Sequence, residues 1–260
     1  MTDFALAQES YADRLWSKVP LITAAFWAIK IMSTTVGETG ADLLATRLGL
    51  GLTITSLLMT GVFIIFLTMQ LRAKTYVPAL YWLTVVLISV VGTLISDNLV
   101  DGFGISLKTT TIAFSAILAA VFAAWYNSEG TLSIHSIVTF KRECFYWLTI
   151  LFTFALGTSA GDLVAEGFDL GYFLAVNLFG LLILLTAAAY FVFKQNAVVC
   201  FWIAYILTRP FGASIGDLFA KPHIAGGFGL GTVSTSIIFL TIISGLVVYL
   251  TATRSDSEAI

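Results

Sequence analysis

Charged residues are scarce in this chain. Only 11% of its 260 residues are Asp, Glu, Lys or Arg, against about 25% in an average soluble domain. Apolar residues in the broad sense make up 58%, the mean hydropathy is +0.96, and several apolar runs are long enough to cross a bilayer. This composition excludes a soluble enzyme, a nucleic-acid-binding protein and a disordered chain, and it indicates a multi-pass membrane protein.

Cysteine, histidine and the motifs of known chemistry are also sparse. The two cysteines, Cys144 and Cys200, provide neither a disulfide framework nor a soft-metal cluster. The sequence contains no Walker loop, no dinucleotide fingerprint and no hydrolase or metalloprotease signature. We therefore expect no enzyme activity, no cofactor and no nucleic-acid partner.

What the sequence does contain is a fourfold internal repeat. An aromatic–Trp pair opens each unit, an aspartate follows the tryptophan by fifteen residues, and a glycine precedes that aspartate by five. The three sets are Trp27, Trp82, Trp147 and Trp202; Asp42, Asp97, Asp162 and Asp217; and Gly37, Gly92, Gly157 and Gly212. The aspartates are 55, 65 and 55 residues apart. Four units in register at several positions predict an architecture built from repeats.

Each unit contains two apolar segments joined by a short, glycine-rich turn. We expect helices at about 20–46, 51–71, 79–100, 105–126, 143–166, 171–194, 197–220 and 231–252. The predicted fold is an all-α integral membrane protein with eight transmembrane helices, built as four parallel two-helix repeats, because two spans return the chain to its starting side. The predicted segments are 1–17, repeat 1 at 18–74, repeat 2 at 75–126, a connector at 127–142, repeat 3 at 143–194, repeat 4 at 195–252 and a tail at 253–260.

Lys and Arg in the predicted loops indicate the orientation. Eight lie on the side that holds the termini and three lie on the other side. Because positively charged loops stay in the cytoplasm, we expect cytoplasmic termini and a cytoplasmic connector. The four tryptophans are then expected in the cytoplasmic aromatic belt. Each aspartate should lie roughly 22 Å further along its helix.

A pair of small residues four apart precedes each aspartate. Such pairs let helix backbones approach closely. They are Gly37 and Ala41, Gly92 and Ser96, Gly157 and Gly161, and Gly212 and Gly216. If the first helices of the four units pack through these faces, the aspartates share one layer. Ionisable groups in a membrane face a bundle interior, a cavity or a partner, so Asp42, Asp97, Asp162 and Asp217, with Glu38 one turn before the first, are the candidate ion-binding residues.

The chemistry of this layer favours hard cations. It is rich in oxygen and lacks histidine and cysteine, which suits protons, sodium, magnesium, calcium or manganese. We predict a cation transporter or exporter, of a divalent metal such as manganese or of a proton-coupled cation, with the four aspartates as candidate metal ligands. For each aspartate the alternative to cation binding is a structural role in the turn. For the whole chain the alternative to transport is a non-transporting scaffold or sensor that regulates a partner protein.

Two basic residues fall inside the predicted spans. Lys30 shares a helical face with Glu38, so it either lines the inner pathway or extends to the headgroups near Trp27. Arg209 is too deep for that and is expected to neutralise a carboxylate of another unit, as a fixed counter-charge or as a gate. Pro210 directly follows it and should disrupt its helix locally.

The repeat units resemble a known family. The segments YWLTVVLISVVGTLISDNLVDGFG, FYWLTILFTFALGTSAGDLVAEGFDLG and YILTRPFGASIGDLFAKPHIAGGFGLG are similar to bacterial repeat-containing membrane proteins described as uncharacterised membrane-anchored proteins, sometimes as predicted amylopullulanase regulators. The resemblance extends from Lys18 to Leu250. It implies a multi-pass protein of the bacterial inner membrane and supplies no established site. The expected partners are the lipid bilayer and a small inorganic cation, and self-association into a homo-oligomer stays open.

Overall fold

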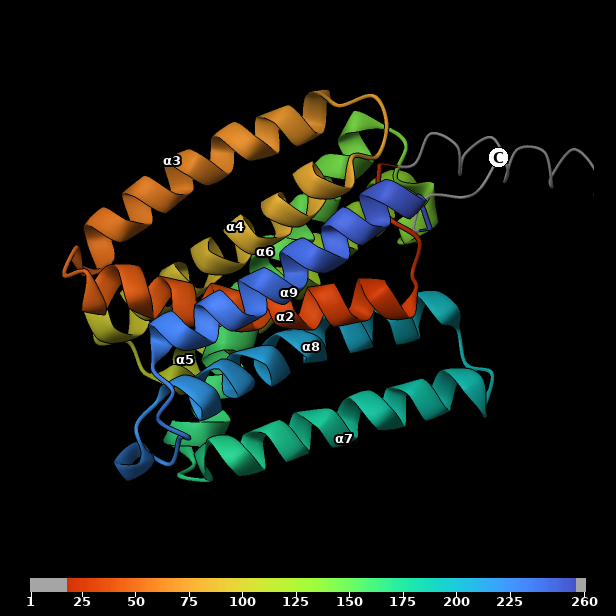
Figure 1. Cartoon of the computed structure of the whole chain (residues 1–260). Helices are drawn as coiled ribbons and strands as arrows, with labels where there is room; N and C mark the ends of the chain where they lie inside the picture. The colour runs from red at the N-terminus through yellow and green to blue at the C-terminus, as the bar shows by residue number, and fades with distance from the viewer. Residues whose placement is uncertain (1–17, 256–260) are drawn as a thin grey trace, which may run out of the picture.

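The structure, a computed structural model, describes residues 18–255, and within them all regular secondary structure is helical (Figure 1). The long helices are α2 (Ala24–Asp42), α3 (Gly51–Arg72), α4 (Pro78–Asp97), α5 (Leu107–Glu129), α6 (Phe140–Asp162), α7 (Gly171–Phe191), α8 (Ala197–Ala220) and α9 (Thr232–Thr253). Two short 3-10 turns, η3 (Ile134–Ser136) and η5 (His223–Ala225), lie in the loops. The predicted segment 1–17 and residues 256–260 of the predicted tail lie outside the described residues.

Capping residues set where several helices begin. The Thr23 side chain accepts a hydrogen bond from the backbone N–H of Phe26, so α2 begins at Ala24 rather than near Pro20. Thr139 caps α6 in the same way by accepting from Arg142, and this helix begins three residues before its predicted start. The apolar pattern in the sequence predicts roughly where a membrane span lies, whereas the capping hydrogen bond determines the residue at which its helix begins.

Three of the four repeats end their first helix in a wider turn. The π-helical segments η1 (Leu43–Arg47), η2 (Asn98–Gly102) and η4 (Leu163–Gly167) each begin directly after the repeat aspartate. In the fourth repeat Lys221 is extended, as expected of a residue before a proline, and α8 ends at Ala220. A π-helical turn changes the direction of the side chains that follow the aspartate, so this end of repeat 4 differs from the others.

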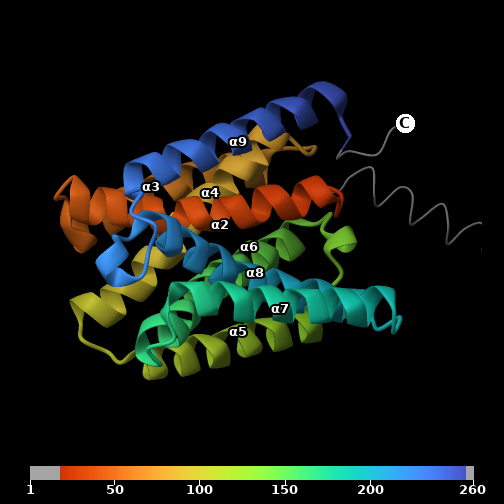
Figure 2. The same ribbon diagram turned by 60° about the horizontal axis from the view of Figure 1, so that its bottom comes forward.

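The four units close around one axis. The first helices of the units form an inner ring in which α2 contacts α4, α4 contacts α6, α6 contacts α8, and α8 contacts α2. The second helix of each unit packs against the first helix of the next unit: α3 on α4, α5 on α6, α7 on α8 and α9 on α2. Figure 2 shows the inner helices between α9 and α3 on one side and α5 and α7 on the other. Each repeat is therefore completed by its neighbour.

Seven of the described helices are long and apolar enough to span a membrane, and α2 is not among them. In the most apolar stretches of α4, α6 and α8, between 56% and 72% of the residues are buried, against 11% to 22% in α3, α5, α7 and α9. Large apolar side chains such as Leu57, Ile112, Leu184 and Val248 are exposed on these outer helices. The outer surface thus has the composition of a lipid-facing one. Helix α2, which is not among these candidate spans, is covered by α4, α8 and α9.

The tryptophans correct one expectation. Trp82, Trp147 and Trp202 are buried in the core, and only Trp27 is partly exposed. Their placement in an aromatic belt facing the headgroups is therefore wrong for three of the four. The reason is the ring of inner helices, which turns these positions toward neighbouring aromatic rings, for example Trp147 toward Tyr81 at a centroid distance of 5.6 Å.

Candidate functional site

One contact, repeated four times, closes the inner ring. The glycine five residues before each aspartate lies against the residue eight positions before the next aspartate around the ring. A methyl group added at any of these glycines would overlap that neighbour, so glycine sets the separation of the helices. The pairs are Gly37 with Ser89, Gly92 with Phe154, Gly157 with Arg209, and Gly212 with Thr34. Equivalent positions of the four repeats therefore lie at similar levels along one axis.

Small residues one turn closer to the aspartates extend these contacts. A methyl group on Gly161 would lie 3.6 Å from Cα of Pro210, and one on Gly216 would lie 3.2 Å from the carbonyl oxygen of Thr35. Between α4 and α6 the hydroxyl oxygens of Ser96 and Ser159 are 3.0 Å apart. The inner helices thus remain close as far as the aspartate level.

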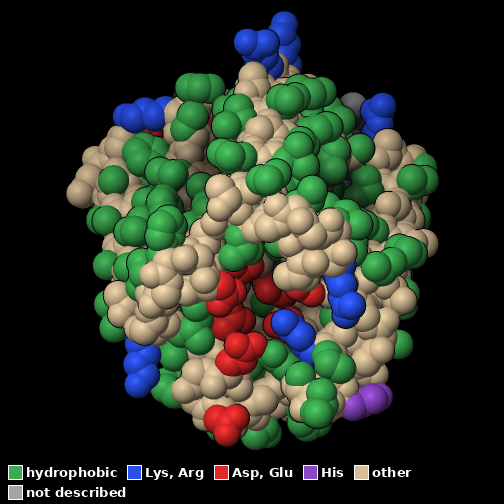
Figure 3. All heavy atoms as spheres, turned by 90° about the vertical axis from the view of Figure 1, so that its left-hand side faces the viewer, with side chains coloured by type: hydrophobic (Ala, Val, Ile, Leu, Met, Phe, Trp, Pro, Cys, Tyr) green, Lys and Arg blue, Asp and Glu red, His purple; other side chains and the backbone are tan. Residues whose placement is uncertain are grey.

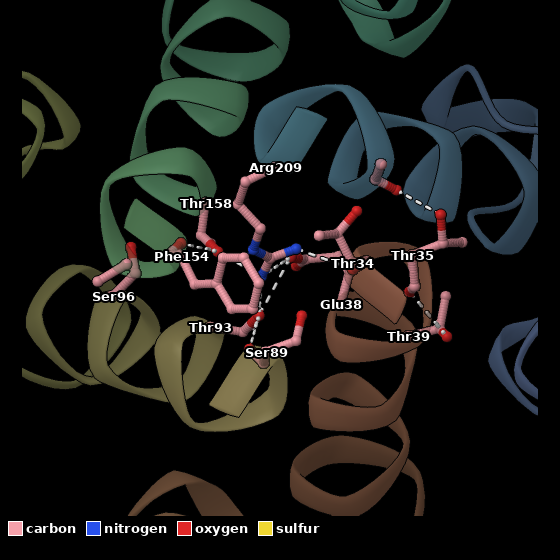
Figure 4. A network of polar contacts seen from close by, with 12 residues as sticks. Thr34, Thr35, Glu38, Thr39, Ser89, Thr93, Ser96, Phe154, Thr158 and Arg209 are labelled. Carbon is pink, nitrogen blue, oxygen red and sulfur yellow. Dashed lines mark hydrogen bonds and ion pairs between the residues drawn. The ribbon is translucent and has the colours of Figure 1, made fainter. Parts of the chain in front are cut away.

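Arg209 lies across the axis and joins all four inner helices. Its side chain starts from α8, is fully buried, and donates hydrogen bonds to the carbonyl oxygen of Thr34 on α2 at 2.8 Å and to Oγ1 of Thr158 on α6 at 2.8 Å. It also donates to Oγ1 of Thr93 on α4. Figure 4 shows the guanidinium at the centre of the four helices. One charged side chain of repeat 4 therefore closes the axis at this level.

Glu38 is the carboxylate that faces Arg209. An Nη atom of the guanidinium lies 3.3 Å from Oε2 of Glu38, and Oγ1 of Thr93 donates to the same oxygen at 3.4 Å. The side chain of Glu38 is 12% exposed, whereas that of Arg209 is fully buried. The carboxylate is therefore the member of the pair that is nearer to the accessible end of the axis.

The four repeat aspartates lie at that accessible end. Figure 3 shows acidic side chains gathered in a hollow at the centre of this face. Asp217 is buried, and the other three are partly buried. Asp162 lies within electrostatic reach of Glu38, Asp217 and Asp97. The layer that the repeat spacing predicts is thus a set of carboxylates around the mouth of one axis.

The aspartates differ in their partners. Asp42 accepts a hydrogen bond from Oγ1 of Thr46 at 2.6 Å, and Asp217 is 3.7 Å from Nζ of Lys221. The side-chain carboxylates of Asp97 and Asp162 form no hydrogen bond or ion pair with any residue between 18 and 255. Two of the four carboxylates are therefore available to an incoming cation without first losing a protein partner.

The predicted metal ligands do not form a closed coordination shell. Among the described residues, no group of three or more acidic, histidine or cysteine side chains is arranged to hold a metal ion. A divalent cation in the hollow would keep much of its water shell, which suits a transported ion better than a structural one.

Lys30 lies on the same axis, on the far side of Arg209 from the aspartates. It is fully buried and donates to the carbonyl oxygen of Tyr205 at 2.8 Å and to Oγ1 of Thr208. Its Nζ atom is 4.2 Å from the centre of the Tyr205 ring and 5.1 Å from that of Phe154. The sequence allows the Lys30 side chain to lie inside the helix bundle or to extend to the headgroups. In the structure it lies inside the bundle.

Aromatic side chains close the axis beyond Lys30. The residue before each repeat tryptophan is buried, and the hydroxyl groups of Tyr81 and Tyr146 are hydrogen-bonded to each other. The four residues are Phe26, Tyr81, Tyr146 and Phe201. The axis in this structure is therefore accessible from the aspartate end and closed at the tryptophan end.

Sequence reasoning did not assign several residues that hold the two buried bases. Thr93 and Thr158 occupy the positions equivalent to Glu38, four residues before their aspartates, and all three bind Arg209. Tyr205 occupies the position equivalent to Lys30 and supplies its acceptor. The shared offset from the repeat aspartate identifies Thr93 and Thr158 in the sequence as companions of their aspartates. Their role as partners of Arg209 depends on the packing of the four inner helices.

Comparison with known proteins agrees with the fourfold pattern. A family model described as a repeat of unknown function, DUF347, matches residues 25–76, 80–131, 145–196 and 200–256, one match for each pair of helices. No curated protein and no solved structure matches the chain. Since the four matches cover most of the sequence, the chain belongs to the DUF347 repeat family.

Proposed function

We propose that this protein is a carrier for a small inorganic cation, such as manganese, in the bacterial inner membrane. One observation carries the proposal: the four repeat aspartates and Glu38 interact electrostatically with one another at the end of an axis that Arg209, bound to Glu38, closes. Carboxylates are costly at such a place in a membrane bundle, and the side chains of Asp97 and Asp162 have no structural partner among the described residues.

The topology of the proposal is four parallel units with cytoplasmic termini. The ring contacts between equivalent positions of successive repeats support the parallel arrangement. The excess of Lys and Arg on the side of the termini, eight against three, supports the orientation. The acidic hollow then faces the periplasm, and the aromatic closure faces the cytoplasm.

In the first step the hollow concentrates cations. A recess lined by carboxylates raises the local concentration of positive ions. Asp97 and Asp162 receive the hydrated cation because they have no competing partner among the described residues. The ion then reaches Glu38, whose carboxylate oxygen is shared between Arg209 and Thr93.

In the second step the cation replaces Arg209 at Glu38. Arg209 acts as a tethered counter-charge: it neutralises the carboxylate while the site is empty and leaves it when the transported ion arrives. Pro210 supports such a movement, because it has no N–H to donate to the carbonyl oxygen of Ile206 and weakens α8 next to the guanidinium.

Flux measurements in proteoliposomes test the proposal. We expect uptake of Mn²⁺ driven by its gradient, and a loss of at least tenfold for Asp97→Asn and Asp162→Asn. Asp169→Asn is the matched control, because Asp169 is exposed on the turn between η4 and α7, and asparagine tolerates its left-handed backbone, φ 56°. Wild-type flux in all four variants Asp42→Asn, Asp97→Asn, Asp162→Asn and Asp217→Asn would rule out the carboxylate mechanism.

A further inference from the structure

We propose that Lys30 carries the proton that is exchanged for the transported cation. The inference rests on the proposed function and specifies that a proton is the ion coupled to cation transport. It assigns the proton to a buried amine on the closed side of Arg209 rather than to the carboxylates of the hollow. Lysine can lose its proton when its surroundings change, whereas arginine remains charged.

The surroundings of Lys30 contain no counter-charge. Within residues 18–255 no carboxylate lies within ion-pair distance of Nζ, although the side chain is fully buried. Buried lysines without a carboxylate partner are the ones whose protonation responds to small changes in local charge. This separates Lys30 from Lys18, whose Nζ is 2.8 Å from a carboxylate oxygen of Glu143.

The groups that face Lys30 come from each helix around it. On α8 they are Arg209, which acts on Lys30 electrostatically, and Tyr205. The charged or titratable members of α4 and α6 nearest to this level are Tyr81 and Tyr146, one turn toward the closed end. The aspartates of these two helices lie three turns away in the other direction. The covering helix α9 contains no charged residue.

The contacts of Nζ suit both protonation states. A neutral amine has two N–H groups, and Lys30 donates two hydrogen bonds, to the Tyr205 carbonyl and to Thr208. In the ammonium form the added positive charge is stabilised by the faces of Tyr205 and Phe154. The site therefore does not require a rearrangement of its neighbours when the proton leaves.

Arg209 couples the proton to the cation. The guanidinium carbon is 5.6 Å from the centre of the Phe154 ring, the ring that Nζ of Lys30 approaches to 5.1 Å. When a cation takes Glu38, the guanidinium loses its counter-charge, and the positive potential at Lys30 rises. An N–H bond of the ammonium group then breaks, the nitrogen keeps the electron pair, and the proton passes to a water molecule. Cation on Glu38 and proton on Lys30 thus exclude each other.

Calorimetric titration of the purified full-length protein with Mn²⁺, in two buffers of different ionisation enthalpy, counts the protons released. We expect about one proton per bound Mn²⁺ for the wild type, and an affinity that rises about tenfold per pH unit while Lys30 is protonated. Lys30→Met should bind Mn²⁺ without releasing a proton, since it has no ionisable group. Lys30→Arg keeps a fixed positive charge, so it should bind Mn²⁺ more weakly than the wild type and release no proton. Lys74→Met, at an exposed lysine after α3, should behave as the wild type.

The outcomes separate this inference from the proposed function. No Mn²⁺ binding by the wild type overturns the proposed function for this ion, and the inference falls with it. Binding without proton release, or release that persists in Lys30→Met or Lys30→Arg, overturns the inference and leaves the carrier proposal intact. Should Lys30→Met fail to fold, Lys30→Arg decides the matter, because it alone distinguishes a mobile proton from a fixed charge.

Discussion

Gly157 of α6 lies directly against Arg209 of α8, so that a methyl group on the glycine would overlap Cβ and Cγ of the arginine. At the other three junctions of the ring the same contact holds a threonine, a serine or a phenylalanine. Only at this junction does a charged side chain leave the contact and cross the axis. Arg209 therefore does two things: it packs against Gly157 at the α6–α8 junction of the ring, and its side chain blocks the central axis.

Gly157→Ala should displace Arg209 and destabilise the protein. Overpacking a tightly packed interface costs about 1–3 kcal/mol, and the shift would weaken the hydrogen bonds of the guanidinium to Thr34 and Thr158. Thermal unfolding in detergent measures the effect. The control is Gly61→Ala on α3, where no atom lies within 4 Å of the added methyl; alanine there should stabilise the helix by about 0.5–1 kcal/mol. Equal effects at the two sites would contradict the packing role.

Glu38→Gln should destabilise the protein more than the double variant Glu38→Gln with Arg209→Met. The single variant leaves a buried guanidinium without its carboxylate, a loss of about 3 kcal/mol, whereas the double variant removes both charges. A double-mutant cycle by chemical unfolding in detergent gives the coupling between the two residues, which should lie between about 0.5 and 3 kcal/mol. Additive effects would show that the ion pair contributes nothing to the fold.

Lys18→Met should cost more stability than Lys141→Met, although both remove a lysine from an ion pair. Glu143, the partner of Lys18, is buried and would lose a contact of 2.8 Å, a loss of about 3 kcal/mol. Lys141 is 63% exposed and pairs with Glu129, which also holds Arg142; its removal should cost less than about 1 kcal/mol. Unfolding temperatures of the two variants check the order, and the reverse order would contradict it.

Lys221→Met should lower stability by the same amount at about pH 6 and at about pH 9. Burial lowers the pKa of Lys221, but the carboxylates of Asp217 and Asp42 outweigh this and raise the pKa above its usual value. A folded-state pKa above the unfolded value of about 10.4 gives a contribution that is fully present below the unfolded pKa and is lost as the pH rises through the folded one. Because the side chain is 37% exposed, the loss should stay below about 1 kcal/mol. Unfolding at both pH values measures it, and a deficit that shrinks toward pH 9 would count against the coupling.

The helices and the repeat could be predicted because both depend on local pattern. Fifteen residues from Trp27 to Asp42 recur in every unit, and the apolar runs between the turns give each span within a few residues. The first residues of α2 and α6 are harder to predict from the sequence, because each depends on a single capping hydrogen bond, at Thr23 and at Thr139. Nor does the sequence say that the four units form one ring, because that depends on contacts between helices far apart in the chain.

The partners of the two buried bases could be predicted only in part. The depth of Arg209 implies a carboxylate of another unit, and Glu38 of the first repeat is the one it meets. The choice among the acids follows from the ring, which places α2 beside α8. For Lys30 the sequence left two positions open, because a lysine near a helix end reaches either the headgroups or the interior. The packing of Tyr205 and Phe154 around Nζ decides between them.

The order of synthesis has a consequence for biogenesis. The helix that covers α2 is α9, which is synthesised after the other long helices of residues 18–255. Helix α8, which also packs against α2, is synthesised just before it. Until then α2, with Lys30 and Glu38 and too little hydropathy for an independent span, lacks the neighbours that bury its polar face. We therefore expect the first repeat to remain in the insertion machinery, or at the membrane surface, until the fourth repeat is made. A truncated chain that ends after α7 would leave it unprotected and should be degraded rather than stored.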